Sequence, residues 1–324
     1  MKLLIISQKM AKNDLILGFF HHWVEEFSKY FEKITVICLE ESEHNLPENV
    51  KVFSLGKEKD NLQFTIYNLQ SIFNSKIFKR IKYLFRFYKY IWLERKSYDA
   101  VFVHMNQEYV LLAWDFWKLW GKKIYLWRNH AKGSFLTRLA VFVSDKVFCT
   151  SPSSYTARFK KTKLMPVGID TDFFKPDSSV PKIPNSILFL GRVSPVKRVL
   201  EFVEWFNVQD TKFTATVAGS SLPQDRGYEN LVRSRASGRI KFINSVTQEQ
   251  ALELYRVHEI YVNKTLKGSF DKTIFEAAAC GMKIKVDNED LKNVESKNPE
   301  ELRNFVIKNH SLNLLTKKLT QEIV

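Results

Sequence analysis

The segment SILFLGRVSPVKRVLEFVEWF, residues 186–206, contains a strand, a turn and a helix in succession. The apolar run SILFL predicts a buried strand, Gly191 ends it, and Pro195 suits the first turn of a helix that continues to Phe206. A strand that passes through a glycine turn into a helix is the repeating unit of parallel sheets. The segment therefore predicts an α/β fold.

The same alternation extends in both directions from this segment. Further apolar runs predict strands at 2–7, 33–39, 100–105, 122–127 and 146–150, and again at 213–219, 240–244, 260–265 and 282–287, with helical patterns in most of the intervals. Four prolines, Pro166, Pro176, Pro181 and Pro184, fall in a stretch of little periodicity. We expect two Rossmann-like domains with a cleft between them, at 1–165 and 186–308, joined by residues 166–185 and followed by a helix over 309–324.

Length and composition agree with a two-domain protein. The 324 residues exceed the usual size of one hydrophobic core, and no window approaches 18 uncharged apolar residues. The start, MKLLIIS, predicts a first strand rather than a signal peptide, so we expect a cytoplasmic protein. Cys38, Cys149 and Cys280 lie far apart, which predicts small buried residues and neither a disulfide nor a zinc site.

The positive charge is concentrated in the first half of the chain. Residues 1–170 hold 27 Lys and Arg against 16 Asp and Glu, whereas residues 171–324 hold 23 against 19, and the formal net charge is +15. Such an imbalance predicts an anionic partner for the first domain. Nucleic acid, an acidic membrane surface and a phosphorylated substrate all fit, and the charge alone does not separate them.

Two cations follow the strand of the opening segment. Arg192 comes directly after Gly191, and Lys197 lies in the expected first turn of the helix. A helix N-terminus already carries positive potential, so two added cations favour a bound anion with several oxygens, such as a diphosphate. The alternative is a pair of solvated surface charges, which strand–glycine–arginine sequences often contain.

A second segment, GSFDKTIFEAAACGMKIKV at 268–286, predicts another helix and strand. Asp271 is the expected N-cap of the helix and Gly281 its stop. Glu276, on the first turns, can accept hydrogen bonds from both hydroxyls of a vicinal diol such as a ribose. An exposed charge near a helix start is the alternative for Glu276.

Taken together, FLGRVSPVKR at 189–198, FDKTIFEAAACG at 270–281 and MPVGIDTDFFKP at 165–176 resemble the family-4 retaining glycosyltransferases of the glycosyltransferase-B fold. The resemblance covers most of the chain. It implies two facing Rossmann-like domains, with a nucleotide sugar held mainly by the second domain and an acceptor by the first. It also implies that the final helix crosses back onto the first domain.

The resemblance assigns roles to individual residues. Arg192 and Lys197 correspond to the pair that neutralises the donor diphosphate, Glu276 to the glutamate that binds the ribose, and His130 to the histidine that faces the donor sugar. The implied catalytic residues are His130, Arg192 and Lys197, and the implied donor-binding residues are Gly18, Gly191, Gly219, Asp271, Lys272, Thr273 and Glu276. Where the family has the first glutamate of its motif this chain has Gly268, and the following Ser-Phe-Asp-Lys suggests that Asp271 and Lys272 contact the sugar or phosphates instead.

The activity that the resemblance implies is metal-independent sugar transfer with retention of configuration, without a cofactor. Cations beside a helix N-terminus can stabilise the charge that builds on the leaving diphosphate. The DTD sequence at 170–172 suggests a metal motif of another fold, but its place in the connection favours a structural role. A sugar-nucleotide epimerase of the same fold and a catalytically impaired, membrane-associated binding protein remain as alternatives. His21, His22 and His104 are each either cleft residues or packed side chains.

Residues 76–96 combine eight cations and one acid with aromatic side chains. As a helix they place Ile77, Ile81, Leu84, Tyr88 and Ile91 on one stripe and Lys79, Lys82, Arg86 and Lys89 on another. The pattern predicts either a face for an anionic membrane and a lipid-linked acceptor, or an amphipathic helix packed on its own sheet with a solvated basic side. Nucleic-acid binding is disfavoured, because the aromatics follow helical spacing. We expect a protein at the inner membrane surface that acts on a lipid-linked or cell-surface glycan precursor.

Overall fold

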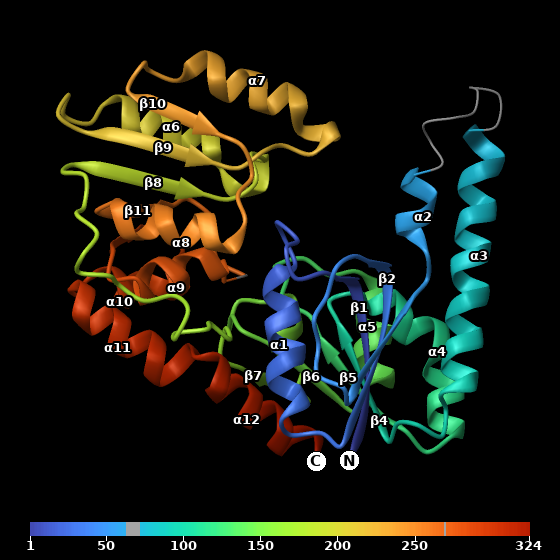
Figure 1. The fold of residues 1–324 in the computed structure, drawn as a ribbon. Helices are drawn as coiled ribbons and strands as arrows, with labels where there is room; N and C mark the ends of the chain where they lie inside the picture. Colours follow the sequence, from blue (N-terminus) through green and yellow to red (C-terminus); the bar gives the residue numbers. More distant parts are fainter. Residues whose placement is uncertain (63–71, 269) are drawn as a thin grey trace. The chain divides into compact units, whose positions relative to one another are not determined.

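The computed structural model describes residues 1–62, 72–268 and 270–324, and the chain forms two units (Figure 1). The N-terminal unit comprises Met1–Cys149, Ser154–Met165 and Thr316–Val324, and the C-terminal unit comprises Thr150–Ser153 and Pro166–Leu315. Each unit contains its own parallel sheet, so the predicted pair of α/β folds is confirmed.

The sheet of the N-terminal unit has the strand order β3-β2-β1-β4-β5-β6-β7, and every pairing that the described residues show in it is parallel. The strands are β1 (Lys2–Met10), β2 (Lys33–Glu41), β3 (Val50–Ser54), β4 (Ala100–His104), β5 (Lys123–Trp127), β6 (Lys146–Cys149) and β7 (Thr162–Leu164). The direction of winding reverses between β1 and β4. In open parallel sheets, ligands bind beyond the carboxyl ends of the strands at such a reversal.

Helices cover both faces of this sheet. They are α1 (Gly18–Ser28), α2 (Lys57–Leu62), α3 (Ile72–Leu93), α4 (Gln107–Leu119), α5 (Phe135–Val143) and the later turns of α12 (Leu312–Ile323). Buried residues of α3, α4 and α5 share one core cluster with the strands. On the other face Trp23 of α1 packs against Trp127, with 5.0 Å between the ring centroids. The Tyr125 hydroxyl on the same face donates a hydrogen bond to the carbonyl of Ile323 in α12.

The C-terminal unit has the strand order β10-β9-β8-β11-β12, again parallel. The strands are β8 (Ser186–Leu190), β9 (Thr214–Ala218), β10 (Ile240–Ile243), β11 (Ile260–Asn263) and β12 (Lys283–Val286), and the helices are α6 (Val199–Asn207), α7 (Arg226–Arg235), α8 (Gln248–Val257), α9 (Lys272–Ala279), α10 (Lys292–Glu295) and α11 (Pro299–His310). The winding reverses between β8 and β11.

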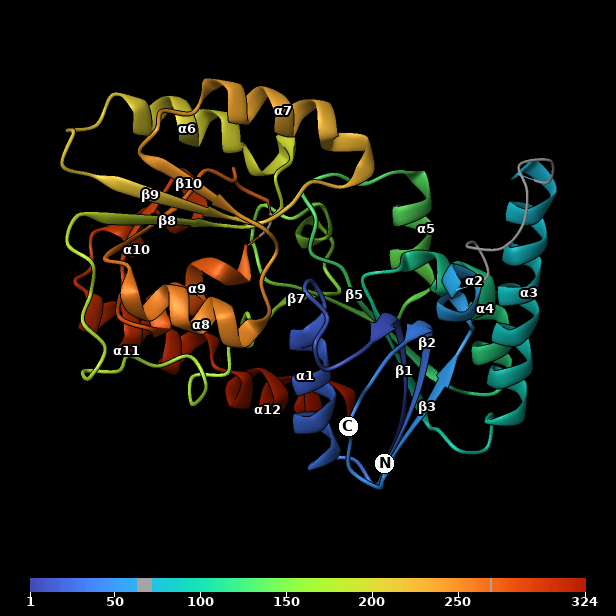
Figure 2. The ribbon, with the colours of Figure 1, turned by 45° about the horizontal axis from the view of Figure 1, so that its top comes forward.

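Two apolar layers hold this unit together. Helices α6 and α7 lie on one face of the sheet and α8 and α9 on the other, as Figure 2 shows from a second direction. Phe202 and Phe206 of α6 pack with Phe189 of β8 in the first layer. In the second layer Ala277, Ala278 and Ala279 of α9 are buried and allow the helix to approach the sheet closely.

The predicted helix start after β8 is wrong. Pro195–Lys197 forms a single 3-10 turn, Arg198 has a left-handed backbone with φ 53°, and α6 begins only at Val199. Because a left-handed residue cannot continue a right-handed helix, Lys197 lies in a turn of its own just before the helix. Elsewhere the three cysteines are buried, as expected. None of the helices that the structure describes is both long and apolar enough to cross a membrane.

Candidate functional site

The loops that follow β8 and β11 meet at the reversal point of the C-terminal sheet. Lys197, from the loop after β8, forms an ion pair with Asp271, which precedes α9 on the other side of the reversal. The two side chains are 21% and 9% exposed. Two residues that are 74 positions apart in the sequence are thus held together at the place where this type of sheet binds ligands.

Asp271 is fixed by three donors. Besides Lys197, its carboxylate accepts hydrogen bonds from Asn263 Nδ2 at 3.0 Å and from Thr265 Oγ1 at 2.7 Å. Burial by itself would raise the pKa of Asp271, but the charge of Lys197 and these hydrogen bonds outweigh it and lower the pKa below the ordinary value. Asp271 occupies the N-cap position of α9, yet its side chain makes no capping hydrogen bond, so the predicted capping role is corrected to anchoring Lys197.

Arg192 extends from the same loop as Lys197. Its side chain is exposed, and it forms no ion pair with any residue that the structure describes. The turn that carries Arg192 is fixed by two backbone hydrogen bonds, from Gly191 N–H to the carbonyl of Ala218 at the end of β9 (3.0 Å) and from Val193 N–H to the carbonyl of Ser220 in the loop after β9 (3.2 Å). The exposed guanidinium is therefore carried on a well-held backbone.

Gly219 makes the close approach of these two loops possible. It has φ 148°, and a Cβ atom at this position would lie 2.0 Å from the carbonyl oxygen of Gly191. Any other residue would have to move the turn that presents Arg192. Gly219 thus shapes the site through its backbone.

Lys272 and Glu276 lie one turn apart on α9, and both are engaged within the unit. Tyr255 donates a hydrogen bond to Glu276 Oε2 at 3.0 Å, and Lys272 Nζ donates to the carbonyl oxygens of Val167 and Gly168 at 3.3 Å and 2.8 Å. Burial raises the pKa of Glu276 and lowers that of Lys272, while each charge partly offsets the effect on the other. The alternative of an exposed helix-start charge at Glu276 is wrong, because this residue is buried.

Thr273 connects the start of α9 to the end of β8. The hydroxyl of the buried Tyr261 lies 2.6 Å from Thr273 Oγ1 and 3.2 Å from the carbonyl oxygen of Leu190. The connection residue Asp170 closes a turn, because its carboxylate accepts from the backbone N–H groups of Asp172 and Phe173. This geometry agrees with a structural role for the DTD sequence.

His130 lies in the loop after β5 of the N-terminal unit and is exposed. His130 Nδ1 lies 3.0 Å from the backbone N–H of Lys132 and 3.1 Å from the carbonyl oxygen of the same residue, so this ring nitrogen is engaged with its own loop. The backbone carbonyl of His130 accepts from Tyr155 N–H at 2.9 Å, which holds the loop in place. Nε2 is therefore the ring nitrogen that the loop leaves for other contacts.

Gly18 and the other N-terminal histidines have packing roles that the structure makes visible. Gly18 begins α1, and a Cβ there would lie 2.8 Å from the carbonyl oxygen of Lys12. His104 is buried and stacks on Phe20 with 4.1 Å between ring centroids. His21 is also buried, which lowers its pKa to about 4, and His22 lies beside Glu25. His21 and His104 are therefore packed in the unit, whereas His22 is partly exposed.

The basic set on α3 is divided by the structure. Arg86 donates to the carbonyl oxygen of Leu55 at 2.8 Å and lies against Gly56, so it faces the unit and not the solvent. Lys79 is half-buried, whereas Lys82 and Lys89 are exposed. The predicted membrane or acceptor face therefore retains only two of its four cations.

Several residues of the site were missed by the sequence analysis. Asn263, Thr265, Tyr255 and Tyr261 contact the predicted residues, but none was singled out. The polar residues of IYVNKT, which follow a buried strand directly, were an available signal, because the carboxyl ends of such strands face the ligand. The two tyrosines carried no signal, since buried tyrosines are common in any core.

No protein-family model matches the chain, and no curated protein matches its sequence. Solved structures do match over nearly the whole length. Anabaena HepE in complex with UDP-glucose has a TM-score of 0.67 at 14% identity, covering 99% of this chain and 95% of that one. Sucrose-phosphate synthase from Thermosynechococcus elongatus has a TM-score of 0.64 at 15% identity, and the match covers 99% of this chain and 94% of that one. The lipopolysaccharide outer core galactosyltransferase WaaB has a TM-score of 0.61 at 13% identity, and the match covers 99% of each chain. These likenesses show that the chain has the fold of glycosyltransferase-B proteins.

Proposed function

We propose that this protein is a glycosyltransferase that takes its sugar from a nucleoside diphosphate donor bound by the C-terminal unit. The observation that carries the proposal is the Lys197–Asp271 ion pair at the reversal of the sheet, with Arg192 exposed on the same turn as Lys197. Cations at the point where the strand order of a parallel sheet reverses are suited to bind a ligand that carries phosphate groups. The UDP-glucose bound by HepE supports this class of donor.

The diphosphate is assigned to Arg192 and Lys197. Arg192 supplies a planar, permanently charged fork that can take two phosphate oxygens at once. Lys197 supplies a point charge whose position is set by Asp271. When the bond to the sugar breaks, negative charge builds on the diphosphate, and cations that are already in position stabilise that charge.

The ribose is assigned to Glu276. Tyr255 donates to Oε2 of this carboxylate, and the structure shows no hydrogen bond from the described residues to Oε1. The neighbouring Lys272 favours the ionised carboxylate against the effect of burial. Glu276 then accepts from the ribose hydroxyls. Lys272, whose Nζ donates to the carbonyl oxygens of Val167 and Gly168, supports the charge of Glu276 in this proposal and does not make the contact to the sugar or phosphates that the sequence suggested.

The stereochemistry, the metal requirement and the acceptor are further parts of the proposal. Retention of the anomeric configuration and independence of metal follow from the resemblance to the family-4 enzymes. Arg192 and Lys197 then neutralise the diphosphate, as a metal ion does in other enzymes. The resemblance also assigns His130 to the donor sugar, and in this proposal Nε2 is the ring nitrogen that donates a hydrogen bond to it. The acceptor is a lipid-linked or cell-surface glycan precursor bound by the basic N-terminal unit, at the inner face of the membrane.

The first test is nucleotide binding. Calorimetry with UDP, GDP and ADP on the wild-type protein identifies the base, and the double variant Arg192→Ala/Lys197→Met is compared with Arg235→Ala/Lys241→Met, which removes the same charges elsewhere on the unit. We expect the first variant alone to lose nucleotide affinity. Undiminished affinity would overturn the donor-site assignment. Incubation with the sugar nucleotide alone, followed by product analysis, tests the alternatives, since an epimer indicates an epimerase and binding without any turnover on acceptor lipids indicates a binding protein.

A further inference from the structure

Helix α3 exposes an apolar stripe along its length. Among the side chains that the structure describes, Phe78, Phe85 and Trp92 are 68%, 71% and 52% exposed. Ile77 and Ile81 on the same side are also more than half exposed. A stripe of large apolar residues that no core covers marks an interaction surface.

The stripe does not belong to the core of the unit. Phe87 and Ile91 of α3 are the residues that enter the core cluster with the sheet. At 100° per residue, these two lie well around the helix from Ile81 and Phe85. The alternative in which Ile77, Ile81 and Leu84 pack on the sheet is therefore wrong, because all three are exposed. One face of α3 holds the helix to the unit, and a second apolar face is left for another partner.

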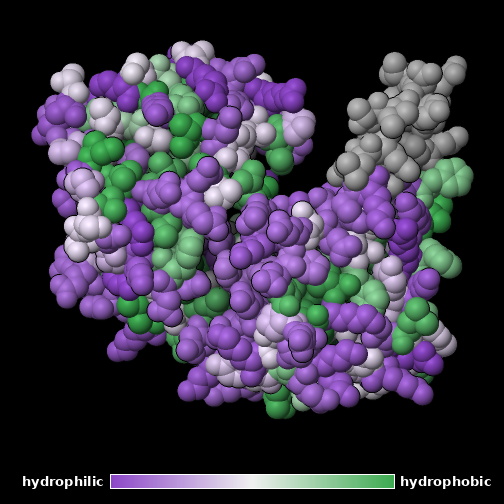
Figure 3. Space-filling view, viewed as in Figure 1, coloured by the Kyte–Doolittle hydropathy of each residue, from purple (hydrophilic) through white to green (hydrophobic). Residues whose placement is uncertain are grey.

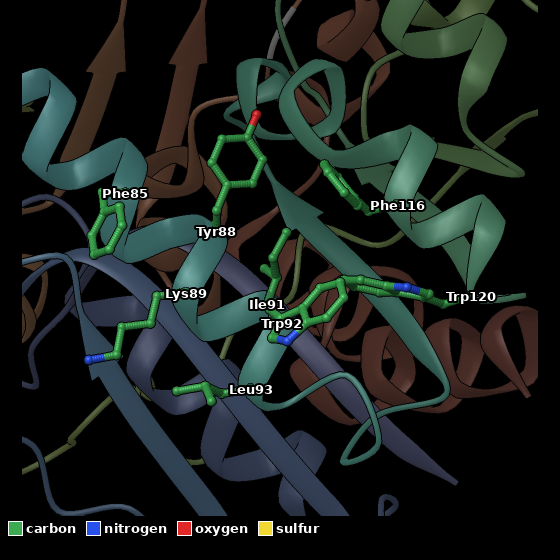
Figure 4. Close-up of a pocket in the computed structure, with 8 residues that line it drawn as sticks. All are labelled: Phe85, Tyr88, Lys89, Ile91, Trp92, Leu93, Phe116 and Trp120. Carbon is green, nitrogen blue, oxygen red and sulfur yellow. The ribbon is translucent and has the colours of Figure 1, made fainter.

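The stripe continues into a groove between α3 and the end of α4. The groove has a volume of about 560 Å³ and is lined by Phe85, Tyr88, Lys89, Ile91, Trp92, Leu93, Phe116 and Trp120 (Figure 4). Trp92 and Trp120 form an edge-to-face pair with ring centroids 5.7 Å apart. Aromatic rings with a polar atom are enriched where proteins meet the boundary between lipid headgroups and acyl chains.

A row of cations borders the apolar stripe. Lys82 and Lys89 are exposed and seven residues apart, so they lie on one side of α3, and Lys96 is exposed in the turn that follows the helix. The only acid that the described part of α3 and its following turn contain is Glu94, which pairs with Lys51 at 3.2 Å on the side of the sheet. Figure 3 shows hydrophobic residues at the edge of the unit where α3 lies, next to strongly hydrophilic ones.

We propose that this surface, formed by the apolar stripe, the groove and the lysine row of α3, docks on an anionic lipid bilayer. The apolar residues enter the boundary between headgroups and acyl chains, and the three lysines meet headgroup phosphates. A second copy of the chain fits less well, since a symmetric contact would bring two identical lysine rows together. The link to a lipid-borne acceptor rests on the proposed function, whereas the docking itself rests on the surface alone.

The test is co-sedimentation of the full chain with vesicles of phosphatidylcholine, with and without phosphatidylglycerol. We expect binding that requires the anionic lipid and weakens with salt. Lys82→Gln/Lys89→Gln/Lys96→Gln lowers partitioning by about fivefold per lysine, on the order of 100-fold in all. Lys241→Gln/Lys283→Gln/Lys308→Gln, with the same charge change on the other unit, is the control and leaves binding unchanged.

The apolar part of the surface is tested with Phe78→Ser/Phe85→Ser/Trp92→Ser. We expect this variant to lose vesicle binding, whereas Val208→Ser/Leu231→Ser, which removes exposed apolar side chains of the other unit, retains it. Light scattering on the same samples reports the oligomeric state, and UDP calorimetry reports the donor site. The docking proposal would be overturned if the wild-type protein did not bind anionic vesicles, or if the wild-type protein were a dimer and the serine variant a monomer. Intact UDP binding in either case leaves the proposed function unaffected.

Discussion

Lys197 and Asp271 form an ion pair between the loops that follow two neighbouring strands, β8 and β11, where the winding of the C-terminal sheet reverses. The pair joins a cation that faces the candidate phosphate site to a carboxylate that is tied to Asn263 and Thr265. The cation is thereby placed before any ligand arrives. Preorganisation of this kind reduces the ordering that binding must otherwise bring about.

The first prediction concerns the stability of this pair. Lys197→Met leaves the buried Asp271 without its charged partner and is expected to destabilise the protein by about 3 kcal/mol, measured by urea unfolding. Lys197→Met/Asp271→Asn removes both charges and should recover most of that loss. Lys241→Met, at an exposed position, is the control. A single variant as stable as the control would show that the pair does not hold the loops together.

The second prediction follows from the lowered pKa of Asp271. Between the ordinary pKa of 3.8 and the lower folded value, the unfolded chain binds a proton that the folded protein does not, so stability falls as the pH falls through this window. The contribution of Asp271 is therefore fully present above pH 3.8 and is lost in acid. Asp271→Asn should be less stable at neutral pH and lose less on acidification. Urea midpoints measured from neutral to acid pH decide this, and parallel curves for the two proteins would contradict it.

How far the sequence predicts this site depends on the kind of interaction. Arg192, Lys197 and Asp271 could be located because glycine, proline and helix patterns place them after strands, and the order of strands places those ends together. The pairing of Lys197 with Asp271 could not, because local patterns assign Asp271 to the N-cap of α9. The Asp271 carboxylate binds Lys197, which is distant in the sequence, instead of capping α9, and a rule based on neighbouring residues does not include such a partner.

The fold was predictable for a similar reason, and its errors are also local. Buried parallel strands read as apolar runs, so β1, β2 and β8 were recognised, whereas β3 and β7, which are short and lie toward the edge, were not. The start of α6 was misplaced because Pro195 resembles a helix start, and nothing in the sequence shows that Arg198 adopts a left-handed backbone. For the apolar stripe of α3 the sequence left two alternatives open, a membrane face and packing on the sheet, since periodicity shows that a face is apolar but not what it contacts.

The third prediction tests the close approach of the loops after β8 and β9. Gly219→Ala places a Cβ at 2.0 Å from the carbonyl oxygen of Gly191 and forces the turn that carries Arg192 to move. We expect a loss of about 1–3 kcal/mol in stability together with weaker UDP binding. Gly238→Ala is the matched control, because a Cβ there meets no atom within 4 Å. If both variants bind UDP equally well, the backbone contact does not shape the site.

The fourth prediction concerns Glu276 and the ribose. Glu276→Gln retains an acceptor for Tyr255 but loses the charge, so UDP affinity should fall by about tenfold, as for a hydrogen bond to a charged group. Affinity for 2′,3′-dideoxyuridine diphosphate should not change, because that ligand has no diol to donate. Glu253→Gln, on the exposed side of α8, serves as the control. An equal loss for both ligands would assign the effect to folding of the site.

The fifth prediction separates His130 from the donor-binding residues. Its ring is carried on a loop that is fixed by Tyr155 and Lys132, and the proposal gives its Nε2 donor a role only toward the sugar. His130→Ala should therefore lower turnover by about 100-fold, typical of the removal of one preorganised donor, while UDP affinity stays the same. His44→Ala, in a partly exposed loop that is distant in the sequence from His130, should change neither turnover nor UDP affinity. Since binding and turnover are measured on one preparation, a parallel fall in both would place His130 at the nucleotide or in the fold, and unchanged turnover would remove it from the mechanism.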